Sequence, residues 1–145
     1  MRRRPWARTP TINGNNAFPD ANDWAGIRFF DASDDASVLR NCQIYFAGYN
    51  TSSYGAVHCD NASPTLRNCN LKAATYGLKC VGVANPALYN SSINAMLDVP
   101  VAIEISANPT FDSIAFGSTS DNGFDAIGIL GGTLPGVNRL GIRSA

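Results

Sequence analysis

Four ionisable side chains recur at one place in a repeated pattern of this 145-residue sequence. Arg28, His58, Lys79 and Glu104 each stand between two apolar residues. Together they could bind a charged ligand or transfer protons. Inverting hydrolysis of a glycosidic bond requires two carboxyl groups about 6.5–9.5 Å apart, however, and this series supplies only Glu104. We therefore predict no catalytic residue here, and expect a solvated stripe of mixed charge.

A run of aromatic residues precedes His58 in the longest segment between two expected strands. Long loops of this kind carry function on rigid scaffolds, and tyrosine offers both a flat ring and a hydroxyl to a sugar. The predicted glycan contacts are Tyr45, Tyr49, Tyr54, His58, Lys79 and Glu104. The alternative is that Tyr45 continues a strand while the other two tyrosines cover the edge of the fold.

Acidic turns are the only candidates for metal ligands. Asp31, Asp34 and Asp35 would lie beside Asp60 of the next repeat, and oxygen atoms that converge from neighbouring turns can hold calcium. Aspartate is far more often only a turn former, because its side chain bonds nearby backbone groups. No cysteine pair has the C-x-x-C spacing of a zinc site, and His58 is the single histidine. We therefore predict neither a metal nor another cofactor.

The four cysteines fall at two repeated places. Cys42 and Cys69 are one repeat apart, and so are Cys59 and Cys80. The residues at these places in other repeats are small or apolar, which predicts reduced thiols stacked in the core. A disulfide within one pair is the alternative, because neighbouring strands bring Cα atoms to about 4.8 Å. Parallel Cβ directions would strain such a bridge.

The elements that must position these residues are short strands, repeated about every 22 to 27 residues. Apolar and polar residues alternate within each repeat, as at 57–59, which is typical of a strand with one buried face. A turn cluster such as 60–64 follows, and then two further short strands. Three strands and their turns in one repeat predict a parallel β-helix. Helical repeats fit poorly, since no window has apolar residues at i, i+3, i+4 and i+7.

Stacked repeats predict columns of equivalent residues along the coil. The first apolar column is expected to contain Ile27, Val57, Leu78, Ile103 and Ile127. The second is expected to contain Leu39, Leu66, Leu88 and Phe111. A polar column, bonded through its side-chain amides, is expected at Asn41, Asn68 and Asn90, with Asp112 in the fourth place. The same alignment gives one outward column of Arg28, His58, Lys79, Glu104 and Gly128.

The repeated letters at 24–29, 62–69 and 76–80 resemble right-handed parallel β-helix repeat proteins of the pectin-lyase-like superfamily. The resemblance covers about residues 24–130. It implies a right-handed coil with saccharide grooves along one outer sheet face. The paired carboxylates that hydrolases of this fold carry on neighbouring strands have no match in this sequence.

The expected fold is therefore all-β: a single-stranded right-handed parallel β-helix (solenoid) of about five rungs of three short strands. Residues 1–23 are predicted to be an irregular lead-in, 24–130 the rungs, and 131–145 a rung edge or the start of a further repeat. We expect uncapped rungs either to continue in a longer coil or to associate end to end.

Composition restricts the partners and the location. Eleven basic and eleven acidic residues give a net charge of zero, which argues against a nucleic-acid partner. No apolar stretch approaches the roughly 18 residues of a membrane helix, so no membrane span is expected. Asp, Asn, Gly and Ser are abundant while Glu104 is the only glutamate, and we expect an extracellular or cell-surface protein whose export signal lies outside this sequence.

Two functions fit these observations. The preferred one is a non-catalytic extracellular β-helix scaffold or surface domain that binds a polysaccharide or cell-surface glycan. The alternative is a fragment of a polysaccharide lyase or glycoside hydrolase whose active residues lie mostly on other rungs. A carboxylate pair on the outer face would favour the enzyme, whereas an aromatic platform without one would favour binding.

Overall fold

The computed structural model describes residues 19–48, 54–112 and 121–132 of the chain. These residues are all β, and they include no helix that could span a membrane. The strands in chain order are β1 (Ile27–Phe29), β2 (Val38–Arg40), β3 (Gln43–Tyr45), β4 (Gly55–Asp60), β5 (Thr65–Arg67), β6 (Asn70–Lys72), β7 (Tyr76–Val81), β8 (Ala87–Tyr89), β9 (Ser92–Asn94), β10 (Val101–Ile103), β11 (Thr110–Phe111) and β12 (Ile127–Ile129).

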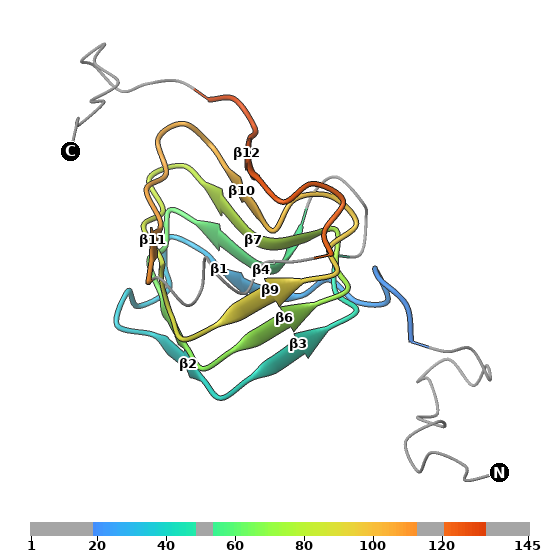
Figure 1. The fold of residues 1–145 in the computed structure, drawn as a ribbon. Helices are drawn as coiled ribbons and strands as arrows, with labels where there is room; N and C mark the ends of the chain where they lie inside the picture. The colour runs from blue at the N-terminus through green and yellow to red at the C-terminus, as the bar shows by residue number, and fades with distance from the viewer. Residues whose placement is uncertain (1–18, 49–53, 113–120, 133–145) are drawn as a thin grey trace, which may run out of the picture.

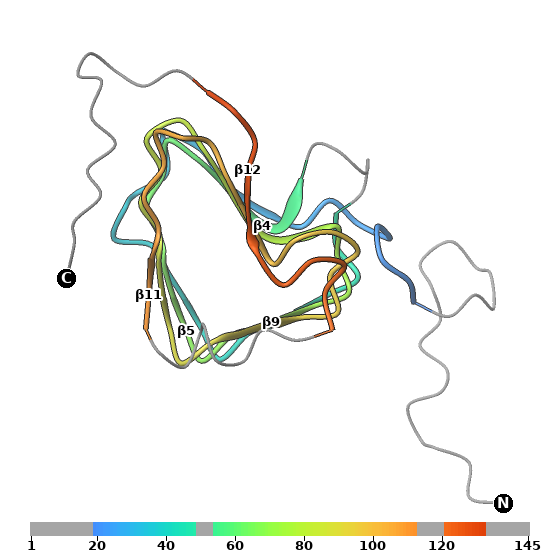
Figure 2. The ribbon, with the colours of Figure 1, turned by 45° about the horizontal axis from the view of Figure 1, so that its top comes forward.

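The strands stack into three parallel sheets that enclose one core, as Figures 1 and 2 show. The first sheet has the order β1-β4-β7-β10-β12, the second sheet β2-β5-β8-β11 and the third sheet β3-β6-β9. Each turn of the coil adds one strand to each sheet, so the chain is a parallel β-solenoid. Three turns are complete among the described residues, and β10, β11 and β12 extend two sheets beyond them. The expected five full rungs were therefore too many, although the fold class is confirmed.

The first and last strands, β1 and β12, lie inside the range 24–130 predicted for the rungs. Most of the predicted lead-in (1–23) and of the final segment (131–145) lies outside the described residues.

Each strand of the three complete turns contributes an aliphatic side chain to the core. Leu78 of the first sheet, Leu66 of the second sheet and Leu71 of the third sheet are all fully buried. Burying an aliphatic side chain of this size stabilises the fold by about 1.5–3 kcal/mol. Because a single turn buries few such side chains, the turns depend on one another for stability.

The second apolar column is confirmed by the strand register. Leu39, Leu66, Leu88 and Phe111 are successive Cα partners. The first column is confirmed for Ile27, Val57 and Leu78, but the prediction of Ile103 as the next member was wrong. Val101, and not Ile103, is the partner of Leu78 and of Ile127.

The displacement in the first column begins at Pro100. Its carbonyl oxygen accepts the backbone hydrogen bond of Leu78 at 3.0 Å, and β10 therefore begins at the next residue, Val101. Ile103 lies two residues farther along, opposite Cys80. A shift of two residues keeps the same side chains facing inward, because successive side chains on a strand alternate between its faces.

Left-handed backbone at equivalent corners turns the chain from one sheet to the next. Between the second and third sheets the corner residues Asn41, Asn68 and Asn90 have φ values of 56°, 53° and 47°. Asparagine tolerates this region better than most residues. Asn68 Nδ2 donates to Asn41 Oδ1 at 3.0 Å, and Asn90 Nδ2 donates to Asn68 Oδ1 at 2.7 Å. The predicted asparagine ladder is thus confirmed.

Asp112 is not the fourth member of this ladder. The pairing of Phe111 with Leu88 leaves Asp112 beside Tyr89 rather than Asn90. Its carboxylate Oδ2 accepts a hydrogen bond from the backbone N–H of Asn90 at 2.7 Å. Asp112, which lies in the next turn of the coil, therefore stabilises the corner at Asn90.

All four cysteines are free thiols, as the column pattern predicted. Cys59 and Cys80 are Cα partners on β4 and β7, and both are fully buried. The neighbouring thiol of Cys59 and burial together raise the pKa of Cys80 far above its usual range. Burial also raises the pKa of Cys69, whereas Cys42 is only half-buried.

Candidate functional site

The outer face of the first sheet brings three basic or titratable side chains into one column. Arg28 of β1 is the Cα partner of His58 of β4, which is the partner of Lys79 of β7. Neighbouring strands lie about 4.8 Å apart, so the three side chains emerge next to one another. This part of the expected column is confirmed.

Glu104 does not belong to the column, contrary to the prediction. The place next to Lys79 is taken by Ala102, which is followed by Gly128 on β12. Because β10 begins at Val101, Glu104 lies just beyond the end of that strand. Its backbone N–H donates to the Cys80 carbonyl, and its carboxylate Oε2 accepts from the Gly82 N–H at 2.8 Å. Glu104 thus holds the turn that follows β7.

The middle of the column is buried rather than solvated. His58 is 7% exposed and Lys79 is 8% exposed, so the expected solvated stripe was wrong at these two positions. Two tyrosine rings lie against the column. The His58 and Tyr54 rings pack edge to face with centroids 5.6 Å apart, and Lys79 Nζ lies 5.5 Å from the centroid of Tyr76. Arg28 Cζ lies 3.4 Å from the centroid of the Tyr54 ring.

We call Arg28, Tyr54, His58, Tyr76 and Lys79 the cation–tyrosine cluster. A cation over an aromatic face is stabilised by the ring quadrupole, by about 0.5–2 kcal/mol depending on exposure. The cluster therefore has rings and cations already held in place, which reduces the ordering cost of binding a ligand.

Burial sets the protonation of the cluster. Burial, with further contributions from the charges of Lys79 and Arg28, lowers the pKa of His58 below its ordinary value, while Asp60 and Glu104 oppose the shift. Burial likewise lowers the pKa of Lys79, against the opposing charge of Glu104. Among the described residues, Nδ1 of His58 is buried without a hydrogen-bond partner. Burial thus favours the neutral imidazole, and its Nδ1 atom lies inside the cluster.

Tyr76 belongs to the cluster although the sequence did not single it out. It begins β7, where it is the Cα partner of Gly55. Burial, together with the charge of Asp98 and a hydrogen bond to it, raises the pKa of the Tyr76 hydroxyl. The dipeptide Tyr-Gly at 54–55 recurs at 76–77, and this repetition was the signal that could have identified it.

The predicted aromatic contacts are not all in one place. Tyr54 lies in the cluster, but Tyr45 lies on β3 in the third sheet, where its hydroxyl accepts a hydrogen bond from Asn70 Nδ2 at 2.9 Å. Tyr49 lies outside the described residues. Of the predicted contacts, the structure thus brings together Tyr54, His58 and Lys79, while the charge of Glu104 acts on His58 and Lys79 from beyond the end of β10.

No protein-family model, curated protein or solved structure matches this chain.

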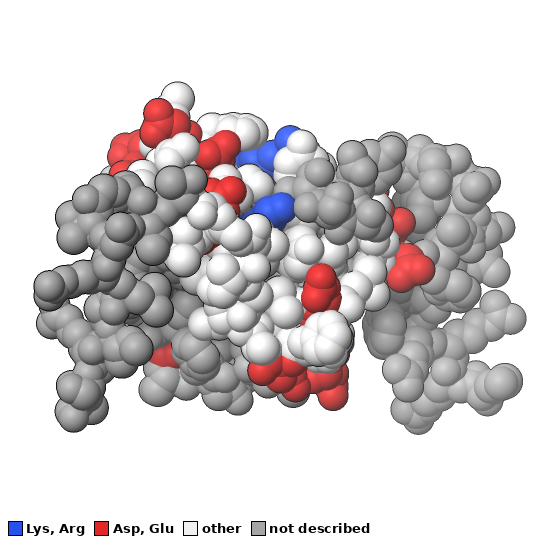
Figure 3. Space-filling model, turned by 90° about the horizontal axis from the view of Figure 1, so that it is seen from above, with Lys and Arg blue, Asp and Glu red and all other residues white. Residues whose placement is uncertain are grey.

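The described residues contain no group of three or more His, Cys, Asp or Glu side chains placed to hold a metal ion. Two of the acidic residues considered for calcium, Asp34 and Asp35, accept backbone hydrogen bonds. Asp35 Oδ1 accepts from the Ser63 N–H at 2.7 Å, and Asp34 Oδ1 accepts from the Ala36 N–H at 2.8 Å. In Figure 3 the visible basic side chains lie near the middle of the molecule with acidic side chains on either side, so neither sign of charge forms a broad field on that face.

Proposed function

We propose that this chain is a non-catalytic extracellular scaffold of the right-handed, pectin-lyase-like kind, which binds a polysaccharide or cell-surface glycan through the outer face of its first sheet. One observation carries the proposal: the column of Arg28, His58 and Lys79 is flanked by the rings of Tyr54 and Tyr76. Tyrosine rings stack on the apolar faces of sugars, and the cations and hydroxyls can bond their oxygen atoms.

The position and hydrogen bonding of Glu104, the single glutamate, favour binding over cleavage. Glycoside hydrolases need two carboxyl groups on either side of the scissile bond. Glu104 stands outside the column and accepts a hydrogen bond from the Gly82 N–H. Asp60, at the end of β4, accepts a hydrogen bond from the side-chain amide of Asn61 at 2.9 Å. Both carboxylates therefore support turns.

The test is a panel of neutral and acidic polysaccharides, scored for retention of the protein and for release of new chain ends. The proposal predicts retention without cleavage. Tyr54→Ala should weaken retention by about tenfold or more, which corresponds to about 1.4 kcal/mol. Tyr89→Ala is the matched control, because Tyr89 is a half-buried tyrosine on the second sheet with Arg67 Cζ 4.4 Å from its ring centroid.

Two results would overturn the proposal. One is the absence of retention on every polysaccharide of the panel. The other is cleavage that is abolished by Glu104→Ala or Lys79→Ala, which would favour the polysaccharide lyase or glycoside hydrolase instead. Thermal melting of each variant separates loss of the site from loss of the fold.

A further inference from the structure

Cys42 and Cys69 occupy the same corner in successive turns of the coil. Each directly precedes a strand of the third sheet, and the residues that follow them, Gln43 and Asn70, are Cα partners on β3 and β6. The Asn70 N–H donates to the Cys42 carbonyl at 2.8 Å, so the parallel ladder extends back to the corner. Neighbouring strands lie about 4.8 Å apart, and disulfides join residues whose Cα atoms are about 4.4–6.8 Å apart. The spacing of the two cysteines therefore suits a bond between them.

The two thiols are also directed toward the same stretch of backbone. Cys42 Sγ donates a hydrogen bond to the Arg40 carbonyl at 3.4 Å, and Cys69 Sγ lies 3.4 Å from the equivalent carbonyl oxygen, that of Arg67. Cys69 Sγ also lies 3.5 Å from the carbonyl oxygen of Leu39, which belongs to the turn that carries Cys42. The two cysteine side chains are in addition hydrogen-bonded to each other. The thiols therefore approach each other across the gap between the turns.

The third residue at this corner is a serine, so Cys69 has one sulfur neighbour in the column. Ser91 is buried in the next turn, where its hydroxyl accepts a hydrogen bond from the Cys69 N–H at 3.1 Å and donates to the Tyr89 carbonyl at 3.0 Å. A hydroxyl cannot form a disulfide. Within this column the partner of Cys69 is therefore Cys42 alone.

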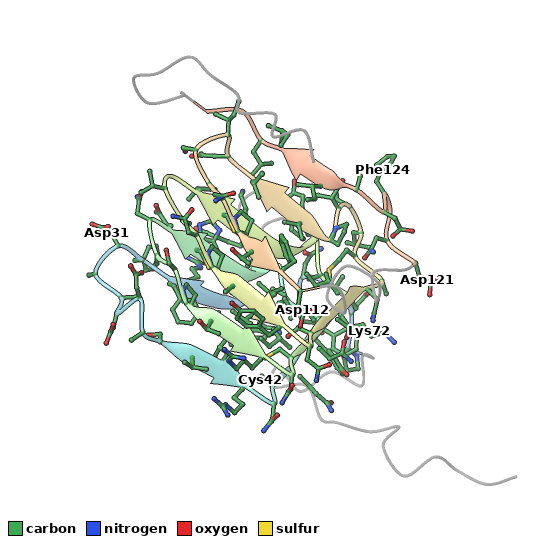
Figure 4. All side chains as sticks on the ribbon, turned by 60° about the vertical axis from the view of Figure 1, so that its left-hand side comes forward. Asp31, Cys42, Lys72, Asp112, Asp121 and Phe124 are labelled. Atoms are coloured by element: carbon green, nitrogen blue, oxygen red, sulfur yellow. The ribbon has the colours of Figure 1, made fainter. Side chains whose placement is uncertain are left out.

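Solvent access distinguishes this pair from the other two cysteines. Cys42 is half-buried, whereas Cys59 and Cys80 are fully buried, although they too are Cα partners on neighbouring strands. Cys42 lies directly before β3, which is the outermost strand of the third sheet among the described residues. Figure 4 shows it at the corner that follows β2, at the first-turn end of the stack. A small oxidant in solution can therefore reach Cys42 more easily than it can reach the core pair.

We propose that Cys42 and Cys69 form an oxidative modification site, at which a hydroperoxide converts the two thiols into a disulfide bond. In the first step the Cys42 sulfur attacks the peroxide, an S–O bond forms as the O–O bond breaks, and the Cys42 proton leaves with the departing oxygen. Cys42 is then a sulfenic acid. In the second step the Cys69 sulfur attacks the Cys42 sulfur, the S–S bond forms as the S–O bond breaks, and the oxygen leaves as water with the Cys69 proton. The two thiols lose two electrons, which reduce the hydroperoxide to one alcohol and one water molecule.

The two cysteines have different parts in these steps. Burial raises the pKa of the Cys69 thiol, so this thiol stays protonated and is the poorer first nucleophile. Cys42 is therefore oxidised first, and Cys69 resolves the sulfenic acid beside it.

The bridge ties the first turn of the coil to the second and closes residues 42–69 into a loop. Closing a loop restricts the unfolded chain, so the oxidised protein is the more stable form. A reducing thiol reverses the reaction, because exposed disulfides are the labile ones. This inference is independent of the proposed glycan binding, since the pair lies between the second and third sheets rather than on the outer face of the first sheet.

The first test is treatment of the native 145-residue chain with hydrogen peroxide, followed by alkylation of the remaining thiols and peptide mapping. The expected product has a Cys42–Cys69 bridge within one chain, while Cys59 and Cys80 are still recovered as thiols. Its urea midpoint is higher than that of the untreated protein, and dithiothreitol restores both the thiols and the original midpoint. The urea-unfolded chain, treated at the same dose, shows that the peroxide is sufficient to oxidise cysteine.

Variants separate the two steps. Cys69→Ala removes the resolving thiol, so Cys42 should accumulate as a sulfenic acid that a cyclic diketone reagent labels. Cys42→Ala removes the first nucleophile, and peroxide should then leave the urea midpoint unchanged. Cys80→Ala is the matched control, because it removes a thiol from the other stacked pair and should form the Cys42–Cys69 bridge as the wild type does.

The proposal is overturned if the native chain keeps all of its thiols at a dose that oxidises the unfolded chain. It is equally overturned by a bridge between the Cys42 residues of two chains, by a Cys59–Cys80 bridge that forms as readily, or by wild-type Cys42 that stops at a sulfenic or higher acid. Melting curves of the variants are recorded, and the peptide map of the wild type decides the matter if Cys69→Ala does not fold.

Discussion

Asn68 donates its side-chain amide to Asn41 Oδ1, 3.0 Å away and one turn back along the coil, while its own backbone stands in the left-handed region with φ of 53°. One residue thus performs two tasks. It turns the chain between the second and third sheets, and it ties that corner to the corner of the preceding turn.

Asn68→Ala is expected to lower the free energy of unfolding by about 2 kcal/mol. It removes exposed side-chain hydrogen bonds worth about 0.5–1 kcal/mol each, and it leaves a residue with a Cβ in a region that costs it about 1 kcal/mol. Asn68→Gly should cost about 1 kcal/mol less, because glycine enters that region freely. Urea denaturation of the three proteins measures both differences, and equal losses for Ala and Gly would contradict the backbone argument.

Leu66→Ala is expected to cost about 2–5 kcal/mol, since Leu66 is fully buried in the second apolar column and its truncation leaves a cavity. Leu97→Ala is the matched control and should change stability by less than about 0.5 kcal/mol, because Leu97 is exposed. The same denaturation experiment compares them. Similar losses at the two sites would mean that the core does not lie between the three sheets.

Stability should fall with acidification through His58. Its folded-state pKa lies below the ordinary value of 6.5, so the unfolded chain takes up the proton first as the pH drops. The contribution is therefore present above about pH 6.5 and is lost as the pH falls toward the lowered folded-state pKa. His58→Gln should flatten the dependence of the urea midpoint on pH in this window. A wild-type and variant pair with parallel profiles would show that His58 does not titrate differently on folding.

The cysteines should differ in their reactivity toward a thiol reagent. Cys42 is half-buried and is expected to react first in the folded protein. Cys59 and Cys80 are fully buried, and the pKa of Cys80 is raised, so both should react only after unfolding. Mass spectrometry of the labelled peptides measures the order. Recovery of a Cys59–Cys80 disulfide peptide from the native protein would contradict the free-thiol arrangement.

The parts of the fold that the sequence predicted are those repeated without interruption. Leu39, Leu66, Leu88 and Phe111 follow one another at the same place in each repeat, and they pair in that order. The asparagine ladder was predictable for the same reason, since its members precede equivalent turns. Tyr76 was missed because the repeated Tyr-Gly dipeptide is one residue out of register: the strand partner of Tyr76 is Gly55 and not Tyr54.

Sequence alone determined that this chain coils into short parallel strands, and it determined which side chains face the core, because alternation along a strand is a local property. Only the tertiary structure decided the register of β10, and with it that Ala102 rather than Glu104 lies next to Lys79. A shift of two residues leaves every inward side chain facing inward, so the pattern of hydrophobicity is the same in either register. In the observed register β10 begins at Val101, directly after Pro100, whose carbonyl oxygen accepts the hydrogen bond of the Leu78 N–H. The burial of His58 and Lys79 was likewise decided by packing between turns, which no single repeat contains.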